Sequence, residues 1–98
     1  MDILGIGASA LVSAGQAARV RANNIVNAET PGFKPQAPVF SQVVNGGGVA
    51  LFTQQANQPV NLLTETLGLK TAALQYKAAA NLVRRADEMH AQFLRAIA

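Results

Sequence analysis

The placement of proline constrains this 98-residue chain more than any other feature. All four prolines fall between Glu29 and Pro59, and the same segment holds the run Gly46-Gly47-Gly48. Because proline removes a backbone donor and clashes with the preceding helical turn, long helices are expected only outside this segment. The sequence therefore predicts three parts: an N-terminal helix over 1–28, a connector over 29–59 and a C-terminal helix over 60–98.

Apolar and small residues recur at intervals of three and four in both proline-free parts, which is the spacing of one helix face. In the C-terminal part this row continues for about four heptads, which is typical of a helix that lies along another at a shallow angle. The fold class expected is mainly α, with two long helices paired as an antiparallel hairpin or coiled coil in one structural unit over 1–98. The expected helix-packing residues are Leu4, Leu11, Ile25, Leu69, Tyr76, Val83, Phe93 and Ile97.

The connector contains two short β-prone runs, VFSQVV and VALFTQ, on either side of the glycine-rich stretch NGGG. Such a pattern is compatible with a β-hairpin over 39–54. Isolated two-stranded hairpins are marginal in water, so a flexible connector is equally compatible with the sequence.

The two predicted helices differ in length, at roughly 35 and 55 Å for a rise of 1.5 Å per residue. A pair of unequal helices leaves the longer one partly uncovered, and neither helix of such a pair can bury a second apolar face. We therefore expect burial between molecules, so that the chain acts as a subunit of an assembly.

Charge and composition argue against several other functions. The net charge of +3 arises from residues spread along the chain, without the interleaved aromatic residues that bind nucleic acid. The sequence has no cysteine, which excludes disulfides and thiolate chemistry. The single histidine, His90, lies within the apolar row of the C-terminal helix, and no catalytic, metal or cofactor motif accompanies it. We expect a structural protein that is not an enzyme, with no cofactor, small-molecule substrate or nucleic-acid partner.

An amide-rich stretch, RANNIVNAETPGFK, closes the N-terminal helix. Asn23, Asn24 and Asn27 stand three and four residues apart, so they gather on one side of a helix. Each amide both donates and accepts hydrogen bonds, and can satisfy a helix end or the backbone of a neighbouring chain. An Asn-rich helix cap with no further role and an assembly joint are both compatible with this stretch.

The residues that follow predict a sharp turn. Thr30 precedes a proline and is biased out of the helical region, which ends the helix. Pro31 and Gly32 suit the two central positions of a type II turn, in which glycine supplies the positive φ. Phe33 then provides a large apolar side chain that we expect to fix where the turn docks.

The same stretch resembles the motif of the bacterial flagellar basal-body rod and hook proteins, which reads close to A-N-N-[LI]-x-N-x-x-T-P-G-[YF]-K. The matching residues are Ala22, Asn23, Asn24, Ile25, Asn27, Thr30, Pro31, Gly32, Phe33 and Lys34. The C-terminal part resembles the C-terminal helix of the same family at Val60, Asn61, Leu62, Glu65, Tyr76, Ala86, Asp87, Glu88 and Met89. The resemblance thus covers both ends of the chain.

This resemblance implies a structural subunit of the flagellar rod, in which N- and C-terminal helices pair and pack beside other subunits around an export channel. It implies other rod subunits, further copies of this chain and the flagellar type III export apparatus as partners. The implied location is the periplasmic rod, reached without a cleaved signal peptide. Because only residues 29–59 separate the helices, the chain resembles a short proximal-rod subunit. The implied assembly joint consists of Asn23, Asn24, Asn27, Thr30, Pro31, Gly32 and Phe33.

Two other interpretations remain open. An apolar N-terminal helix and a cationic C-terminal helix can lie on a bilayer, as in a membrane-surface protein. A diverged helical hairpin outside the flagellum would form a discrete dimer that does not grow. A signal peptide is not expected because Asp2 stands where a positive charge is usual. A membrane span is not expected either, because Arg19 and Arg21 arrive before about 20 apolar residues accumulate.

Overall fold

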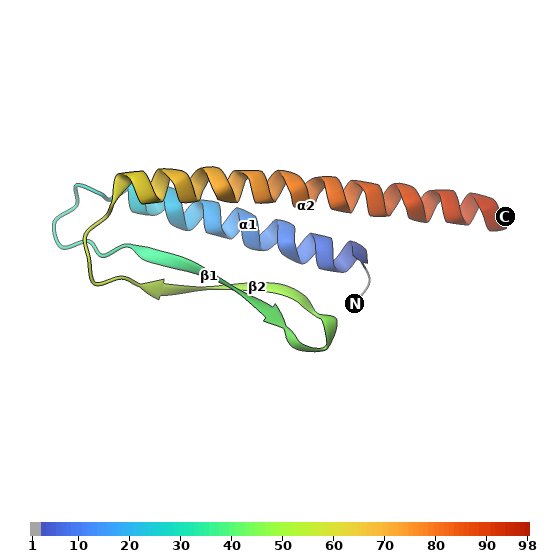
Figure 1. The fold of residues 1–98 in the computed structure, drawn as a ribbon, viewed down its shortest axis with the longest axis horizontal. Helices are drawn as coiled ribbons and strands as arrows, with labels where there is room; N and C mark the ends of the chain where they lie inside the picture. Colours follow the sequence, from blue (N-terminus) through green and yellow to red (C-terminus); the bar gives the residue numbers. More distant parts are fainter. Residues whose placement is uncertain (1–2) are drawn as a thin grey trace.

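The computed structural model describes residues 3–98, so the first two residues of the helix predicted over 1–28 lie outside the described part. The elements in chain order are α1 (Ile3–Val26), β1 (Gln36–Val43), the short 3-10 helix η1 (Val44–Gly46), β2 (Gly48–Gln55) and α2 (Leu62–Ile97). Two helices joined by an antiparallel hairpin make a mainly helical fold (Figure 1), which confirms the predicted fold class.

The two helices run antiparallel, because the start of α1 contacts the second half of α2. A Cβ atom on Gly7 would lie 3.0 Å from a methyl group of Val83, and one on Gly15 would lie 3.5 Å from the ring of Tyr76. Both contacts join residues whose numbers add to about ninety, as an antiparallel pair requires. The absence of a Cβ at Gly7 therefore lets α2 approach α1 closely, whereas a Cβ at Gly15 would make only an ordinary van der Waals contact.

Alanine dominates the buried core between the helices. Five alanines make up its apolar part at 2–8% exposure: Ala14, Ala17, Ala72, Ala79 and Ala86. Those of α2 are seven residues apart and so share one face, as expected for a helix lying along its partner. Since each alanine buries little area, the apolar stabilisation within one chain is small.

Helix α2 is longer than α1, with 36 residues against 24, and it extends past the first described residues of α1 (Figure 1). Phe93 and Ile97 lie on this extension and are 61% and 65% exposed. They were predicted to pack in the helix pair, and within a single chain that prediction is wrong. The heptad row of α2 therefore continues beyond the first described residues of α1, where no part of α1 lies beside it.

The connector is an ordered hairpin whose two eight-residue strands pair from Gln36↔Gln55 to Val43↔Gly48. This hairpin is longer than the one predicted over 39–54. Of the two alternatives that the sequence left open for the connector, the structure has the hairpin. Gly46 at the end of η1 and Gly48 at the start of β2 adopt positive φ values of 71° and 91°, which explains two of the three glycines in the run. The hairpin lies along α1 on the side away from α2 (Figure 1).

Candidate assembly joint at the end of helix α1

Asn24 is the centre of a junction between α1, β1 and α2. Its side chain is completely buried, at 0% exposure. The Nδ2 group donates to the Gln36 carbonyl at 2.7 Å and to Oε2 of Glu65 at 2.9 Å. The Oδ1 atom accepts from the Gln36 amide at 3.1 Å. One amide side chain thus holds the first residue of β1 by both of its backbone groups and also binds α2.

An ion pair completes this junction. Nη1 of Arg21 donates to the same Oε2 atom of Glu65 at 3.2 Å, and the Glu65 side chain is only 7% exposed. A buried carboxylate is tolerated when charged and polar donors surround it, and Glu65 has one of each. Glu65 also lies in the first turn of α2, where a negative charge is favourable to the helix dipole.

Gly68 allows Arg21 to reach Glu65. The Arg21 side chain crosses α2 directly over Gly68, and a Cβ atom there would collide with its Nε atom and lie 2.8 Å from Cζ. Glycine in the interior of α2 lowers helix propensity by about 1 kcal/mol relative to alanine. Its position is therefore explained by the close approach of the arginine.

The other two asparagines lie nearer the surface and cap the end of α1. Nδ2 of Asn27 donates to the Asn23 carbonyl at 2.9 Å and to its side-chain oxygen at 3.1 Å. Oγ1 of Thr30 in turn donates to Oδ1 of Asn27 at 3.3 Å. These bonds link the side chains of the last helical turn to one another and to the Asn23 carbonyl, so the three asparagines divide between an internal role for Asn24 and an outer, helix-ending role for Asn23 and Asn27.

The turn after α1 has the geometry that the sequence predicts. The Phe33 amide donates to the Thr30 carbonyl at 3.2 Å, and Gly32 has a φ of 76°. Pro31 and Gly32 are exposed at the tip, while Phe33 is half-buried. Nothing within 4 Å surrounds the position of a Cβ on Gly32. The turn therefore offers an open surface at the end of the molecule where α1 ends and α2 begins (Figure 1).

A second polar attachment holds the other end of the hairpin. The Val49 amide donates to Oγ of Ser9 at 3.0 Å, and Oγ of Ser13 donates to the Val49 carbonyl at 3.2 Å. Sequence reasoning missed this contact. The available signal was a pair of serines four residues apart on the alanine-rich face of α1, which places two hydroxyl groups side by side.

The remaining predicted packing residues fall into two groups. Leu11, Ile25, Leu69 and Val83 are half-buried along the helix pair. Leu4 and Tyr76 are more open, at 39% and 46% exposure, although the ring of Tyr76 contacts α1 beside Gly15. Small residues, more than these larger ones, thus form the interior of the pair.

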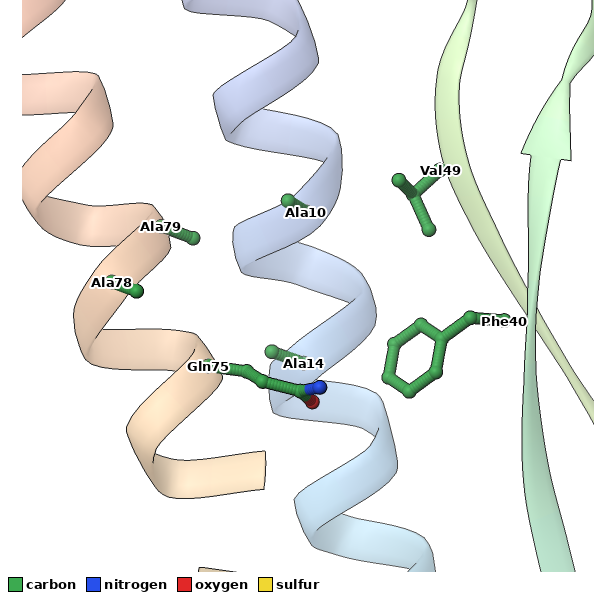
Figure 2. Close-up of a pocket in the computed structure, with 7 residues that line it drawn as sticks. All are labelled: Ala10, Ala14, Phe40, Val49, Gln75, Ala78 and Ala79. Carbon is green, nitrogen blue, oxygen red and sulfur yellow. The ribbon is translucent and has the colours of Figure 1, made fainter. Parts of the chain in front are cut away.

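An open groove of about 450 Å³ separates the helix pair from the hairpin (Figure 2). Phe40 and Val49 of the hairpin face the two helices across it, and among the described residues of its lining Gln75 is the polar one. The helices contribute Ala10, Ala14, Ala78 and Ala79. A groove of this composition suits apolar contact.

Acidic and basic groups are sparse and dispersed. Within residues 3–98, no three His, Cys, Asp or Glu side chains lie close enough together to hold a metal ion. On the surface of α2, Nε of Arg84 lies 4.0 Å from Glu88 in an exposed pair, a kind that contributes at most about 1 kcal/mol.

Helix α1 is long and apolar enough to cross a membrane by length and composition alone, with a mean hydropathy of 1.3 in its most apolar window. Core helices of soluble proteins and N-terminal signal sequences meet the same criterion, so this is weak evidence for a span. In this structure α1 packs against both α2 and the hairpin.

Neither a scan against models of protein families nor a search of curated proteins finds a match to this chain.

Proposed function

We propose that this chain is a structural subunit of the bacterial flagellar basal-body rod, assembled by packing of its helices against those of other subunits. The proposal rests on the sequence resemblance at both ends of the chain. It is supported by the pairing of the N- and C-terminal segments as antiparallel helices with a short connector between them.

A single observation carries the assembly part of the proposal: the chain buries alanine and leaves its large apolar side chains exposed. Helix α2 alone exposes Leu62, Leu63, Leu67, Leu74, Leu82, Met89, Phe93, Leu94 and Ile97. Large apolar residues exposed along a helix of 36 residues support the proposal that other protein covers this surface. A subunit that completes its core only among neighbours has this distribution.

The amide-rich motif serves this function in two ways. Asn24 fixes the angle between the helices and the hairpin from within, and so prepares the shape of the subunit. The exposed turn at Pro31 and Gly32 then faces outward at the end of the molecule, where a neighbouring subunit can contact it. Assembly contacts are therefore assigned to the turn and not to the buried amide.

Quantitative mass spectrometry of purified hook–basal-body complexes from the source organism tests the assignment. We expect this chain at a fixed ratio to the other basal-body components. Its absence from the complexes, together with abundance in the soluble fraction, would reject the rod function and favour a discrete dimer of helical hairpins.

A variant at the turn links the structure to that measurement. Replacing Gly32 by leucine introduces a side chain at a φ of 76°, which costs about 1–2 kcal/mol and adds bulk on the outer surface. We expect normal helix content by circular dichroism but no incorporation into basal bodies. The matched control is Gln58→Leu in the exposed segment before α2, which should be incorporated normally.

A membrane-surface protein is the second candidate, and the apolar character of α1 is the observation that favours it. Co-sedimentation with anionic liposomes separates the two. Tight binding by the monomer that weakens with salt would favour the membrane, because such binding depends on basic residues at charged lipid. The rod proposal predicts no such binding.

A further inference from the structure

We propose that the hairpin of one chain pairs edge to edge with the hairpin of a second copy, with β2 of the first chain hydrogen-bonded to β1 of the second. In this pairing Thr53 lies opposite Gln42 of the next copy, and Gln55 lies opposite Phe40. The proposal concerns backbone groups that the fold of one chain leaves unpaired. It does not depend on the flagellar assignment.

The observed contacts determine which backbone groups point outward. In an antiparallel ladder, residues alternate between those bonded to the partner strand and those directed away from it. Gln36 bonds Asn24 and Val49 bonds the two serines, so both are directed away from the other strand. Counting in steps of two from these positions assigns the outer edges. The outward residues are Gln36, Pro38, Phe40 and Gln42 on β1, and Val49, Leu51, Thr53 and Gln55 on β2.

Helix α1 binds each edge near one end. The β1 edge is bound to α1 at Gln36, and the β2 edge is bound to α1 at Val49, at the opposite end of the hairpin. Figure 1 shows the result: β1 lies nearer the helices at one end and β2 lies nearer at the other. Each strand therefore has one end that faces away from α1.

These two open ends match in length and register. On β1 the open edge contains Phe40 and Gln42, because Pro38 has no amide hydrogen. On β2 the open edge used in this register contains Thr53 and Gln55, because Leu51 would lie opposite Val44, which is outside β1. All four residues are exposed, and each non-proline residue of an outer edge presents one donor and one acceptor. Antiparallel pairing of the two edges would form four backbone hydrogen bonds and leave neither edge open.

The open edges lack the residues that usually prevent an edge strand from pairing with another chain. Edge strands that must remain single carry charged residues, proline or a bulge. The open half of each edge has none of these, and no charged residue or histidine occurs anywhere from Pro35 to Thr64. A second copy of the chain therefore meets no like-charge repulsion across the pair.

A second copy is the occupant that best fits, because each hairpin supplies both halves of the contact. Pairing β2 with β1 is heterologous, so every added copy presents a new open edge and the series can continue. Pairing of β2 with β2 about a two-fold axis would cover only one edge of each chain. The geometry thus points to an open series of hairpins in which each copy is joined to the next in the same direction.

Cysteine cross-linking tests this register, and the natural absence of cysteine makes the background clean. Chains carrying Thr53→Cys and Gln42→Cys are mixed and oxidised with diamide. Directly bonded residues have Cα atoms about 5.5 Å apart, which falls within disulfide range. We expect a disulfide between the two variants, with little homodimer when either is oxidised alone. The control mixture pairs Thr53→Cys with Gln58→Cys, outside the strands, and should form far less.

The unaltered chain provides a second measurement by amide hydrogen exchange. Protection of the Thr53, Gln55 and Gln42 amides should rise with protein concentration, while the Val49 amide, already bound to Ser9, should be protected throughout. Three results would overturn the proposal. They are a mixed disulfide no more abundant than in the control, a dominant Thr53→Cys homodimer, or edge amides whose protection is independent of concentration.

Discussion

Asn24 and Asn23 are adjacent residues of the same type with opposite environments. Asn24 is buried and bonds both backbone groups of Gln36 as well as Glu65, whereas Asn23 is exposed and bonds only its neighbour Asn27. The sequence shows a cluster of amides but does not show which one turns inward, because that depends on where β1 passes. Alanine variants of Asn24 and Asn23 distinguish the roles of these two residues.

Replacing Asn24 by alanine should destabilise the chain by about 2–3 kcal/mol, since buried partners at Gln36 and Glu65 lose their hydrogen bonds. The matched variant Asn23→Ala should change stability by no more than about 0.5 kcal/mol. Urea unfolding followed by circular dichroism measures both. Equal midpoints for the two variants would mean that the buried amide is not a stabilising junction.

Gly68 and Arg21 should show coupled effects. In the natural chain, Gly68→Ala forces Arg21 away from Glu65, and this loss should exceed the gain in helix propensity. In an Arg21→Ala background the same glycine substitution should stabilise the chain by up to about 1 kcal/mol, because only the propensity term remains. A double-mutant cycle from urea unfolding gives the interaction energy. Additive effects would contradict the close approach described for this pair.

At the scale of elements, the hairpin is bound to α1 largely through its backbone. Ser9 and Ser13 hold Val49, and Asn24 holds Gln36, so side chains of α1 take the place of a third strand at two points. Helix positions were readable from proline placement, and the predicted bounds of 1–28 and 60–98 enclose the observed helices. The hairpin attachments were harder to predict: the serine pair and the asparagine cluster mark the polar side chains of α1, but the sequence does not show which backbone groups of the hairpin they bind.

The double variant Ser9→Ala and Ser13→Ala should release the β2 end of the hairpin while leaving the helix pair formed. Hydrogen exchange should show faster exchange at the Val49 amide and unchanged protection in the middle of α2. Val12→Ala, which removes an exposed side chain from the same turn of α1, serves as the control. If the Val49 amide stayed protected in the serine variant, another group would have to be holding this strand.

At the scale of the whole molecule, the chain is a thin body measuring 62 × 25 × 14 Å. Its interior is narrow because alanine and glycine bring the helices close together, and most of its large apolar residues remain outside. The heptad row predicted the direction of α2 correctly but placed Phe93 and Ile97 in the pair. Periodicity identifies a contact face without identifying which molecule covers it.

Trimming Phe93 and Ile97 to alanine should therefore separate folding from assembly. The isolated chain should keep its stability to within about 0.5 kcal/mol per site, as is usual for exposed residues. Under the proposed rod function, incorporation into basal bodies, measured by mass spectrometry, should fall strongly. Ala79→Leu, in contrast, overfills the interior and should lower the stability of the isolated chain by about 1–3 kcal/mol. Loss of stability in the Phe93 and Ile97 variant would show that α2 is covered within one chain.

The stretch from Pro35 to Thr64, which lacks any charged group, also affects how quickly two hairpins meet. Charged surfaces attract partners over long distances and raise association rates, and salt weakens this effect. A neutral hairpin has no such guidance and relies on random encounters followed by alignment of its edges. Its association should proceed at an unsteered rate of about 10⁵–10⁶ M⁻¹s⁻¹ or below, nearly independent of ionic strength. Growth through these edges would then be controlled by subunit concentration and hardly at all by the surrounding salt.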